Sequence, residues 1–68
     1  MIHIRERRLR LSISQAKLAA EVRVNQTAIS QWERGIVTPS LDNAKRLADA
    51  LGCTIDELYE DEPPQAAV

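Results

Sequence analysis

The chain has 68 residues, a size that allows one small domain near the lower limit for independent folding. Hydrophobic residues make up 44% and charged residues 28%, which excludes a generally disordered chain. The single cysteine, Cys53, excludes an intramolecular disulfide and a zinc site built from several cysteines. Because no signal peptide and no long apolar run is present, we expect a protein of the reducing cytoplasm that does not enter a membrane.

The charge is unevenly distributed along the chain. Residues 1–34 carry seven basic and three acidic side chains, a net charge of +4, whereas residues 35–68 carry two basic and seven acidic ones, a net charge of −5. The whole chain has a formal charge of only −1, but the local field decides whether phosphate is attracted. The asymmetry is consistent either with a basic face for nucleic acid or with an ordinary solvated surface.

The first expected helix covers approximately residues 2–11. Ile4, Arg8 and Leu11 recur at the i, i+4, i+7 spacing of one helix face, which predicts that all three point inward. The pattern breaks at Ser12. An arginine on an inward helix face requires a partner for its charge, and the third expected helix contains a candidate.

The second expected helix runs from its N-cap Ser14 to about Val22. Lys17 and Glu21 form an i, i+4 pair on its solvent side. Its apolar stripe comprises Leu18, Ala19 and Val22. The connection to the next helix is so short that the two helices must cross steeply, and Ala19 provides a small residue where the backbones approach.

Asn25 caps a third expected helix that runs to Arg34, and Gly35 follows in the position of a left-handed residue. The segment VNQTAISQWERG has a narrow apolar stripe of Ala28, Ile29 and Trp32. Once this stripe is buried, a polar ridge without acidic side chains faces away from the domain. The ridge comprises Gln26, Thr27, Ser30, Gln31 and Arg34.

This ridge has the groups that recognise base edges in a major groove. Gln pairs bidentately with adenine, Ser and Thr bond flexibly, and the Thr methyl can contact the methyl of thymine. The helix N-termini at Ser14-Gln15 and Asn25 present N–H groups and a positive dipole end to phosphates. The other interpretation is a solvated helix face, although such faces are usually rich in Lys and Glu.

Ser40 caps a fourth expected helix, which Gly52 ends. Its inward residues are Leu41, Ala44, Leu47, Ala48 and Leu51. Thr54 and Glu57 form a capping box for a short fifth helix. That helix contains Ile55, Leu58 and Tyr59. Five short helices without a strand pattern predict an all-α domain.

Glu33 explains the inward position of Arg8. It lies four residues after Ile29 and therefore turns inward with that residue. We expect a partly buried Arg8–Glu33 ion pair that ties the first helix to the end of the third and orients it. The alternative is two separate surface charges.

Two stretches, SQAKLAAEVRVNQTAISQWERG and TPSLDNAKRLADALGCTIDELY, resemble the phage-repressor and Cro-like helix-turn-helix family, also called the XRE type. The resemblance covers residues 2–60. It implies a compact five-helix, lambda-repressor-like domain over residues 1–60, with the helix-turn-helix at the second and third helices. It also implies sequence-specific binding to double-stranded DNA, usually as a twofold dimer on a palindromic operator. The acidic, proline-containing composition of residues 61–68 itself predicts a frayed C-terminal tail.

The resemblance also implies roles for individual residues. The base-contacting positions are Gln26, Thr27, Ser30 and Gln31. The phosphate-contacting positions are Gln15, Asn25, Trp32 and Arg34, and to these we add the N-cap Ser14 and the turn residue Arg23. Gln15 is also expected to buttress Gln26, and Arg8 and Glu33 match the buried pair of the family.

The chain departs from the family pattern at two positions. Arg23 and Ser12 stand where the family frequently has glycine, in the turn and at the end of the first helix. A non-glycine residue in a left-handed conformation costs about 1–2 kcal/mol. Arg23 can compensate by contacting a phosphate.

These expectations describe a transcriptional regulator, a repressor of phage, mobile-element or host origin, and not an enzyme. The expected dimer surface comprises Leu51, Cys53, Ile55, Leu58 and Tyr59. The alternative function is that of an antitoxin or anti-repressor that acts through protein contacts, for which the acidic C-terminal cluster provides a surface. His3 has no ligand set around it, so no metal, cofactor or small-molecule ligand is expected. Cys53 is interpreted as a small core or interface residue.

Overall fold

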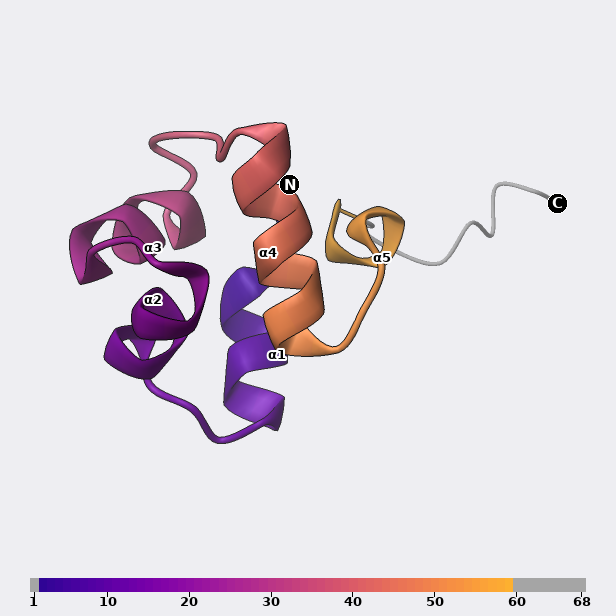
Figure 1. Cartoon of the computed structure of the whole chain (residues 1–68), viewed down its shortest axis with the longest axis horizontal. Helices are drawn as coiled ribbons and strands as arrows, with labels where there is room; N and C mark the ends of the chain where they lie inside the picture. The colour runs from indigo at the N-terminus through magenta and orange to yellow at the C-terminus, as the bar shows by residue number, and fades with distance from the viewer. Residues whose placement is uncertain (1, 60–68) are drawn as a thin grey trace, which may run out of the picture.

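The computed structural model describes residues 2–59 and consists, in that range, of five helices without a strand (Figure 1). The helices are α1 (Ile4–Arg10), α2 (Gln15–Val22), α3 (Gln26–Glu33), α4 (Leu41–Leu51) and α5 (Ile55–Tyr59). The expected all-α architecture is therefore confirmed. The expected tail at 61–68 lies outside the described residues. Between residues 2 and 59, no helix has both the length and the apolar character that crossing a bilayer requires.

Side-chain caps begin α2, α3, α4 and α5 where the sequence predicts them. Ser14, Asn25 and Ser40 each accept a hydrogen bond from the backbone N–H three residues further on, at 3.0, 2.9 and 3.2 Å. Before α5, Thr54 Oγ1 accepts from the Glu57 N–H at 3.1 Å, and Glu57 Oε1 accepts from the Thr54 N–H at 2.9 Å. Each cap satisfies N–H groups that the first turn of a helix leaves unpaired, so local sequence determines these boundaries.

Residues with positive φ end the helices or follow them closely. Gly35 and Gly52 have φ values of +76° and +71°, which glycine adopts without a steric penalty. Ser12 and Arg23 have φ values of +58° and +68° although both carry a Cβ. The two departures from the family pattern are therefore sites of backbone strain, about 1–2 kcal/mol each.

The core is aliphatic apart from Trp32. Its buried cluster comprises Ile4, Leu18, Ala19, Val22, Ile29, Trp32, Leu47, Leu51 and Leu58. Figure 1 shows α4 near the centre of the molecule, with α2 and α3 on one side and α5 on the other. All five helices contribute to this cluster, so the small domain has one continuous core.

Two leucines that the helical periodicity places in the core are exposed. Leu11 is 48% exposed, because α1 ends before it and the positive φ of Ser12 turns the chain; Ile13 packs against the core in its place. Leu41 is 64% exposed, because it is the first residue of α4 and the buried side chains of that helix begin only at Ala44. Both predictions were wrong because the apolar periodicity was extended to a residue at a helix end, where the side chain is not covered by the core.

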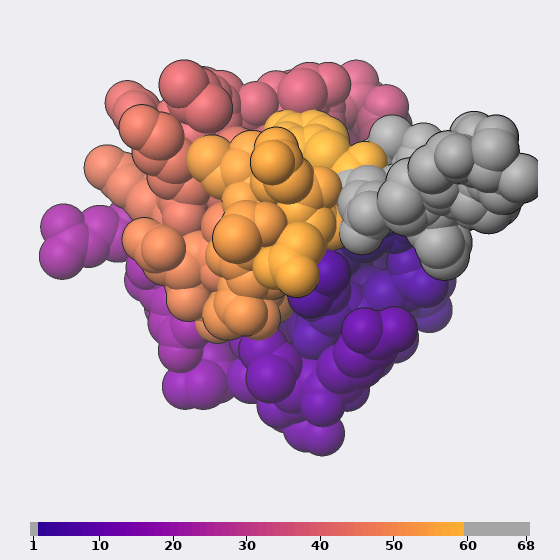
Figure 2. All heavy atoms as spheres, turned by 90° about the vertical axis from the view of Figure 1, so that its right-hand side faces the viewer, coloured from indigo at the N-terminus to yellow at the C-terminus, as the bar shows by residue number. Residues whose placement is uncertain are grey.

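The short helix α5 packs on α4 and against the beginning of the chain. The His3 N–H donates to the Leu58 carbonyl at 2.8 Å, and Arg7 Nη2 donates to the Glu57 carbonyl at 3.4 Å. Figure 2, which faces this side, shows α5 lying across α4 and the start of the chain. Leu51 and Leu58 are buried by this packing, so the prediction that they form part of a dimer surface was wrong. The other three residues of that surface are half-buried: Cys53, Ile55 and Tyr59.

Candidate nucleic-acid interface

Helices α2 and α3 form a tight unit joined by residues 23–25. Arg23, in the left-handed conformation, turns the chain, and the Val24 N–H donates to the Ala19 carbonyl at 3.0 Å. Ala19 and Ile29 are buried where the two helices meet. Packing therefore holds one face of α3 against the domain and leaves its opposite face outward, on the other side of α4 from α5 (Figure 1).

The outward face of α3 carries uncharged hydrogen-bonding side chains. Gln26 and Thr27 are exposed, and Ser30 and Gln31 are half-buried. Glu33 does not contribute to this face, because its side chain is only 5% exposed. The face therefore offers donors, acceptors and a threonine methyl without a negative charge, which suits base edges in a major groove.

Glu33 is held inside the domain by Arg8 of α1. Arg8 Nε donates to Glu33 Oε2 at 2.8 Å and Nη2 donates to Oε1 at 3.3 Å, while Nη1 donates to the Ile13 carbonyl at 3.1 Å. The Arg8 side chain is 11% exposed. Because a bidentate pair constrains both distance and angle, this contact sets the position of the end of α3 relative to α1. The positions of Arg8 and Glu33 on inward helix faces predict the same pair from the sequence.

Two glutamines connect this ion pair with the outward face of α3. Gln15 Nε2 donates to Glu33 Oε1 at 3.0 Å, and Gln26 Nε2 donates to Gln15 Oε1 at 3.3 Å. We call Gln26, Gln15, Glu33 and Arg8 the side-chain relay. The family resemblance implied the contact between the glutamines, whereas the sequence contained no signal for the Gln15–Glu33 contact, which joins residues 18 positions apart.

The helix ends and the turn present groups suited to phosphates. Ser14 and Asn25 cap α2 and α3, and the first-turn N–H groups beside each cap point beyond the helix end. Arg23 in the turn and Arg34 at the C-cap of α3 are exposed. Trp32 differs from these residues because it is only 5% exposed. It anchors α3 in the core.

A family model described as Helix-turn-helix matches residues 4–58. The matched range contains α2, the turn, α3 and both members of the buried ion pair. The chain belongs to the XRE-type helix-turn-helix family. The fold expected from the resemblance, a lambda-repressor-like domain with the helix-turn-helix at α2 and α3, is confirmed.

Individual helix-turn-helix proteins resemble the chain over most of its length. Repressor protein C2 of Salmonella phage P22 is 43% identical over 65 residues, which cover 96% of this chain and 30% of the repressor. Control protein C.BamHI of Bacillus amyloliquefaciens is 42% identical over 57 residues, which cover 79% of this chain and 70% of that protein. A crystal structure of the P22 c2 repressor in complex with a synthetic operator matches with a TM-score of 0.82 and 44% identity, over 87% of this chain and 89% of that one.

The chain spans less than a third of the length of the P22 repressor. These relatives are named as a repressor and a control protein.

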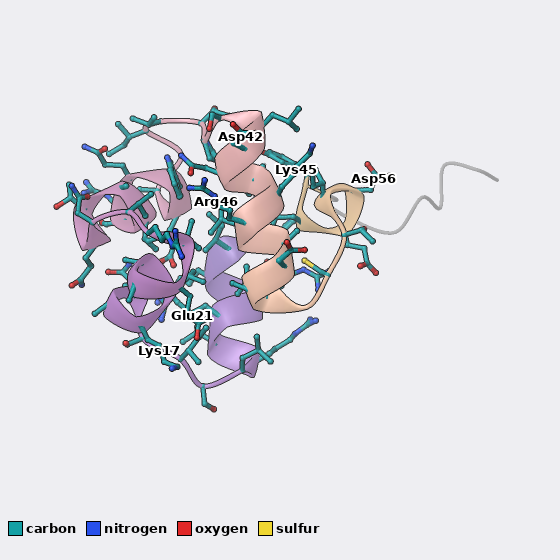
Figure 3. All side chains as sticks on the ribbon, viewed as in Figure 1. Lys17, Glu21, Asp42, Lys45, Arg46 and Asp56 are labelled. Atoms are coloured by element: carbon teal, nitrogen blue, oxygen red, sulfur yellow. The ribbon has the colours of Figure 1, made fainter. Side chains whose placement is uncertain are left out.

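Two of the seven basic side chains of residues 1–34 pair with acidic side chains of the same range, so these pairs leave its net charge of +4 unchanged. The buried ion pair accounts for one positive charge, and Lys17 lies 3.5 Å from Glu21 on α2. Figure 3 shows Lys17 and Glu21 on the surface of α2, below α3 in that view. Arg23 and Arg34 remain exposed beside the helix-turn-helix, where their charges attract phosphate.

A shallow cleft of about 300 Å³ is lined by Glu21, Arg46, Asp49 and Ala50. Figure 3 shows Arg46 on the side of α4 that faces α2. The cleft combines charges of both signs, so it provides no uniform field for an anion or a cation. Within residues 2–59, no group of three or more His, Cys, Asp and Glu side chains is arranged to hold a metal ion.

Two pKa shifts occur near α5, away from the helix-turn-helix. Burial raises the pKa of the Cys53 thiol. The hydrogen bond from the Thr54 backbone N–H lowers the pKa of the Glu57 carboxyl. These shifts belong to the α4–α5 connection and its capping box, and they do not affect the groups on α3.

Proposed function

We propose that this helix-turn-helix chain is a sequence-specific DNA-binding transcriptional regulator that represses transcription by binding a palindromic operator as a dimer. The observation that carries the proposal is the outward face of α3, which is polar, free of acidic groups and flanked by exposed arginines and two helix N-termini. The P22 c2 repressor, 44% identical, was crystallised with a synthetic operator, which supports the same role. We assign DNA binding to residues 1–60 and place the protein in the cytoplasm of a prokaryotic cell.

In the proposed complex, α3 lies in the major groove. The base-contacting side chains are Gln26, Thr27, Ser30 and Gln31. The phosphate-contacting residues are Ser14, Gln15, Arg23, Asn25, Trp32 and Arg34. Both sets come from α2, the turn and α3, so one rigid unit positions the contacts that bring affinity and the contacts that bring specificity.

A dimer is part of the proposal because a single α3 contacts only a few base pairs, and two half-sites about 34–36 Å apart provide the required affinity. Exposed apolar side chains follow α3: Ile36 and Val37 lie in the connection to α4, and Leu41 is the first residue of α4. A twofold contact between two copies at this segment buries apolar surface and brings the C-terminal ends of both α3 helices together.

Sedimentation equilibrium tests this dimer contact. Val37→Asp is expected to lower the association constant at least tenfold, because it places a charge in the apolar contact. Leu9→Asp, at an exposed apolar residue of α1, is the matched control and leaves the association unchanged. Equal effects of the two variants would refute the placement of the contact.

Selection of binding sites from random double-stranded DNA tests the proposed function as a whole. The wild-type chain is expected to select one half-site and its inverted repeat. Gln26→Ala combined with Gln31→Ala removes sequence preference, whereas Arg34→Ala weakens binding to all sequences. Arg34→Ala also reduces the slope of log K against log salt by about 0.9 for each lost contact. Absence of any selected sequence at low salt overturns the proposal and favours a role in protein contacts.

A further inference from the structure

We propose that the buried carboxylate of Glu33 determines which base Gln26 accepts. Acting through Gln15, Glu33 orients the amide of Gln26 so that this residue selects adenine. The inference rests on the proposed DNA binding and adds a positioning role for a residue that does not itself contact DNA. Its structural basis is the side-chain relay, which runs from the core to the outward face of α3.

The orientation of each amide in the relay follows from the carboxylate at its inner end. An ionised carboxylate accepts hydrogen bonds and cannot donate them. Gln15 must therefore direct its amide nitrogen toward Glu33, as the 3.0 Å contact shows. Its oxygen then faces Gln26, so Gln26 must donate through Nε2, at 3.3 Å. The negative charge of Glu33 thus determines the amide orientation of Gln15 and, through Gln15, that of Gln26.

The inner end of the relay is held firmly and the outer end is accessible. Arg8 donates twice to Glu33 and once to the Ile13 carbonyl, and the Glu33 side chain is 5% exposed. Reversal of the Gln15 amide would direct its oxygen at this carboxylate, in surroundings where water screens the repulsion poorly. Gln26 at the other end is exposed. The amide orientation that Glu33 imposes from the core is therefore presented to DNA at Gln26.

The groups of Gln26 that stay available match a single base. A glutamine amide has two N–H donors and one oxygen acceptor, and one donor is used by Gln15. One donor and one acceptor remain. In the major groove, adenine presents one acceptor and one donor, guanine two acceptors, thymine one acceptor beside its methyl, and cytosine one donor. Only adenine pairs with both remaining groups, whereas guanine would oppose its O6 to the Gln26 oxygen.

Glu33→Gln tests the inference with a nearly isosteric change. An amide at position 33 can donate or accept, so it no longer determines the orientation of the two glutamines. The probe is a random double-stranded DNA library, and Gln26→Ala identifies the base pair that Gln26 contacts. The wild-type chain is expected to prefer adenine over guanine there by about tenfold or more. Glu33→Gln is expected to lower this ratio about tenfold and to leave the preferences at other base pairs unchanged.

Two further variants separate orientation from folding. Glu21→Gln makes the same substitution at an exposed residue of α2 that pairs with Lys17, and its base preferences should equal those of the wild type. Gln15→Leu removes the middle of the relay but keeps the Arg8–Glu33 pair, so it provides the test if thermal unfolding shows that Glu33→Gln is not folded. This variant is also expected to lower the adenine preference at the same base pair.

The possible outcomes distinguish this inference from the proposed function. If the wild-type chain selects no DNA sequence, the proposed function fails and the inference fails with it. If the wild-type chain selects a sequence but prefers guanine at the base pair identified by Gln26→Ala, the inference alone is overturned. It is also overturned if folded Glu33→Gln or Gln15→Leu binds every sequence more weakly with the adenine preference intact, because Glu33 then has only a structural role.

Discussion

Arg23 is expected to lower stability and to raise DNA affinity at the same time. Its φ of +68° costs about 1–2 kcal/mol relative to glycine. Arg23→Gly removes this strain, and the greater freedom of glycine in the unfolded chain offsets about 0.4–1 kcal/mol of the gain. The net stabilisation should therefore be about 1 kcal/mol, which corresponds to a rise in Tm of about 4–8 °C for a domain of this size.

The same substitution removes a guanidinium that we place at a phosphate. Arg23→Gly should weaken binding to all DNA sequences and reduce the slope of log K against log salt by about 0.9 for each half-site. The assays are thermal unfolding by circular dichroism and DNA titration at several salt concentrations. Ser12→Gly is the matched control because Ser12 also has a positive φ, of +58°, and has no proposed DNA contact. It should stabilise the domain similarly and leave binding unchanged.

Either half of this reasoning can fail separately. A lower Tm for Arg23→Gly would show that the turn is not strained, or that the arginine makes contacts that outweigh the strain. An unchanged salt slope would show that Arg23 does not contact a phosphate. If Ser12→Gly weakened binding as much as Arg23→Gly, the loss would come from backbone flexibility and the charge would not be its cause.

Arg8→Ala or Glu33→Ala is expected to lower the free energy of unfolding by about 3–5 kcal/mol in chemical denaturation, because the remaining charge stays buried. A loss below about 1 kcal/mol, the range of exposed pairs, would contradict this burial. Hydrogen bonding to Thr54 lowers the pKa of Glu57, so the stability linked to this carboxylate is present above its ordinary pKa and lost as the pH falls through the lower folded value. Glu57→Gln should remove this part of the pH dependence of Tm, and an identical dependence in both proteins would refute the linkage. Burial raises the pKa of Cys53, so the folded thiol should stay protonated at neutral pH and react with a disulfide reagent more slowly than in the urea-unfolded chain. Equal rates in the folded and unfolded chains would contradict this protection.

Helix boundaries could be predicted where the deciding contacts are local. Ser14, Asn25, Ser40 and Thr54 each cap a helix through a group three residues away, and such contacts are visible in any window of the sequence. The ion pair between Arg8 and Glu33 could also be inferred, because two charged residues on inward helix faces require each other. Because an unpaired buried charge is costly, each of these residues predicts a partner of opposite charge even though the two lie far apart in the sequence.

Predictions failed where the position of a residue depends on how helices end and pack. Leu11 and Leu41 follow the apolar periodicity, but both lie at helix ends that extend beyond the core. Leu51 and Leu58 were assigned to a dimer surface because the sequence does not show that α5 packs on α4 and on the backbone of His3.

The sequence by itself determined the helices, their caps, the family and the polar character of the outward face of α3, because these depend on residue type and on spacings of three or four positions. Only the tertiary structure decided how Gln15 connects Glu33 to Gln26. That contact requires α1, α2 and α3 to bring together side chains from distant parts of the chain, within hydrogen-bonding distance. Hydrogen bonds depend on distances and angles in space, which the spacing along the chain does not specify.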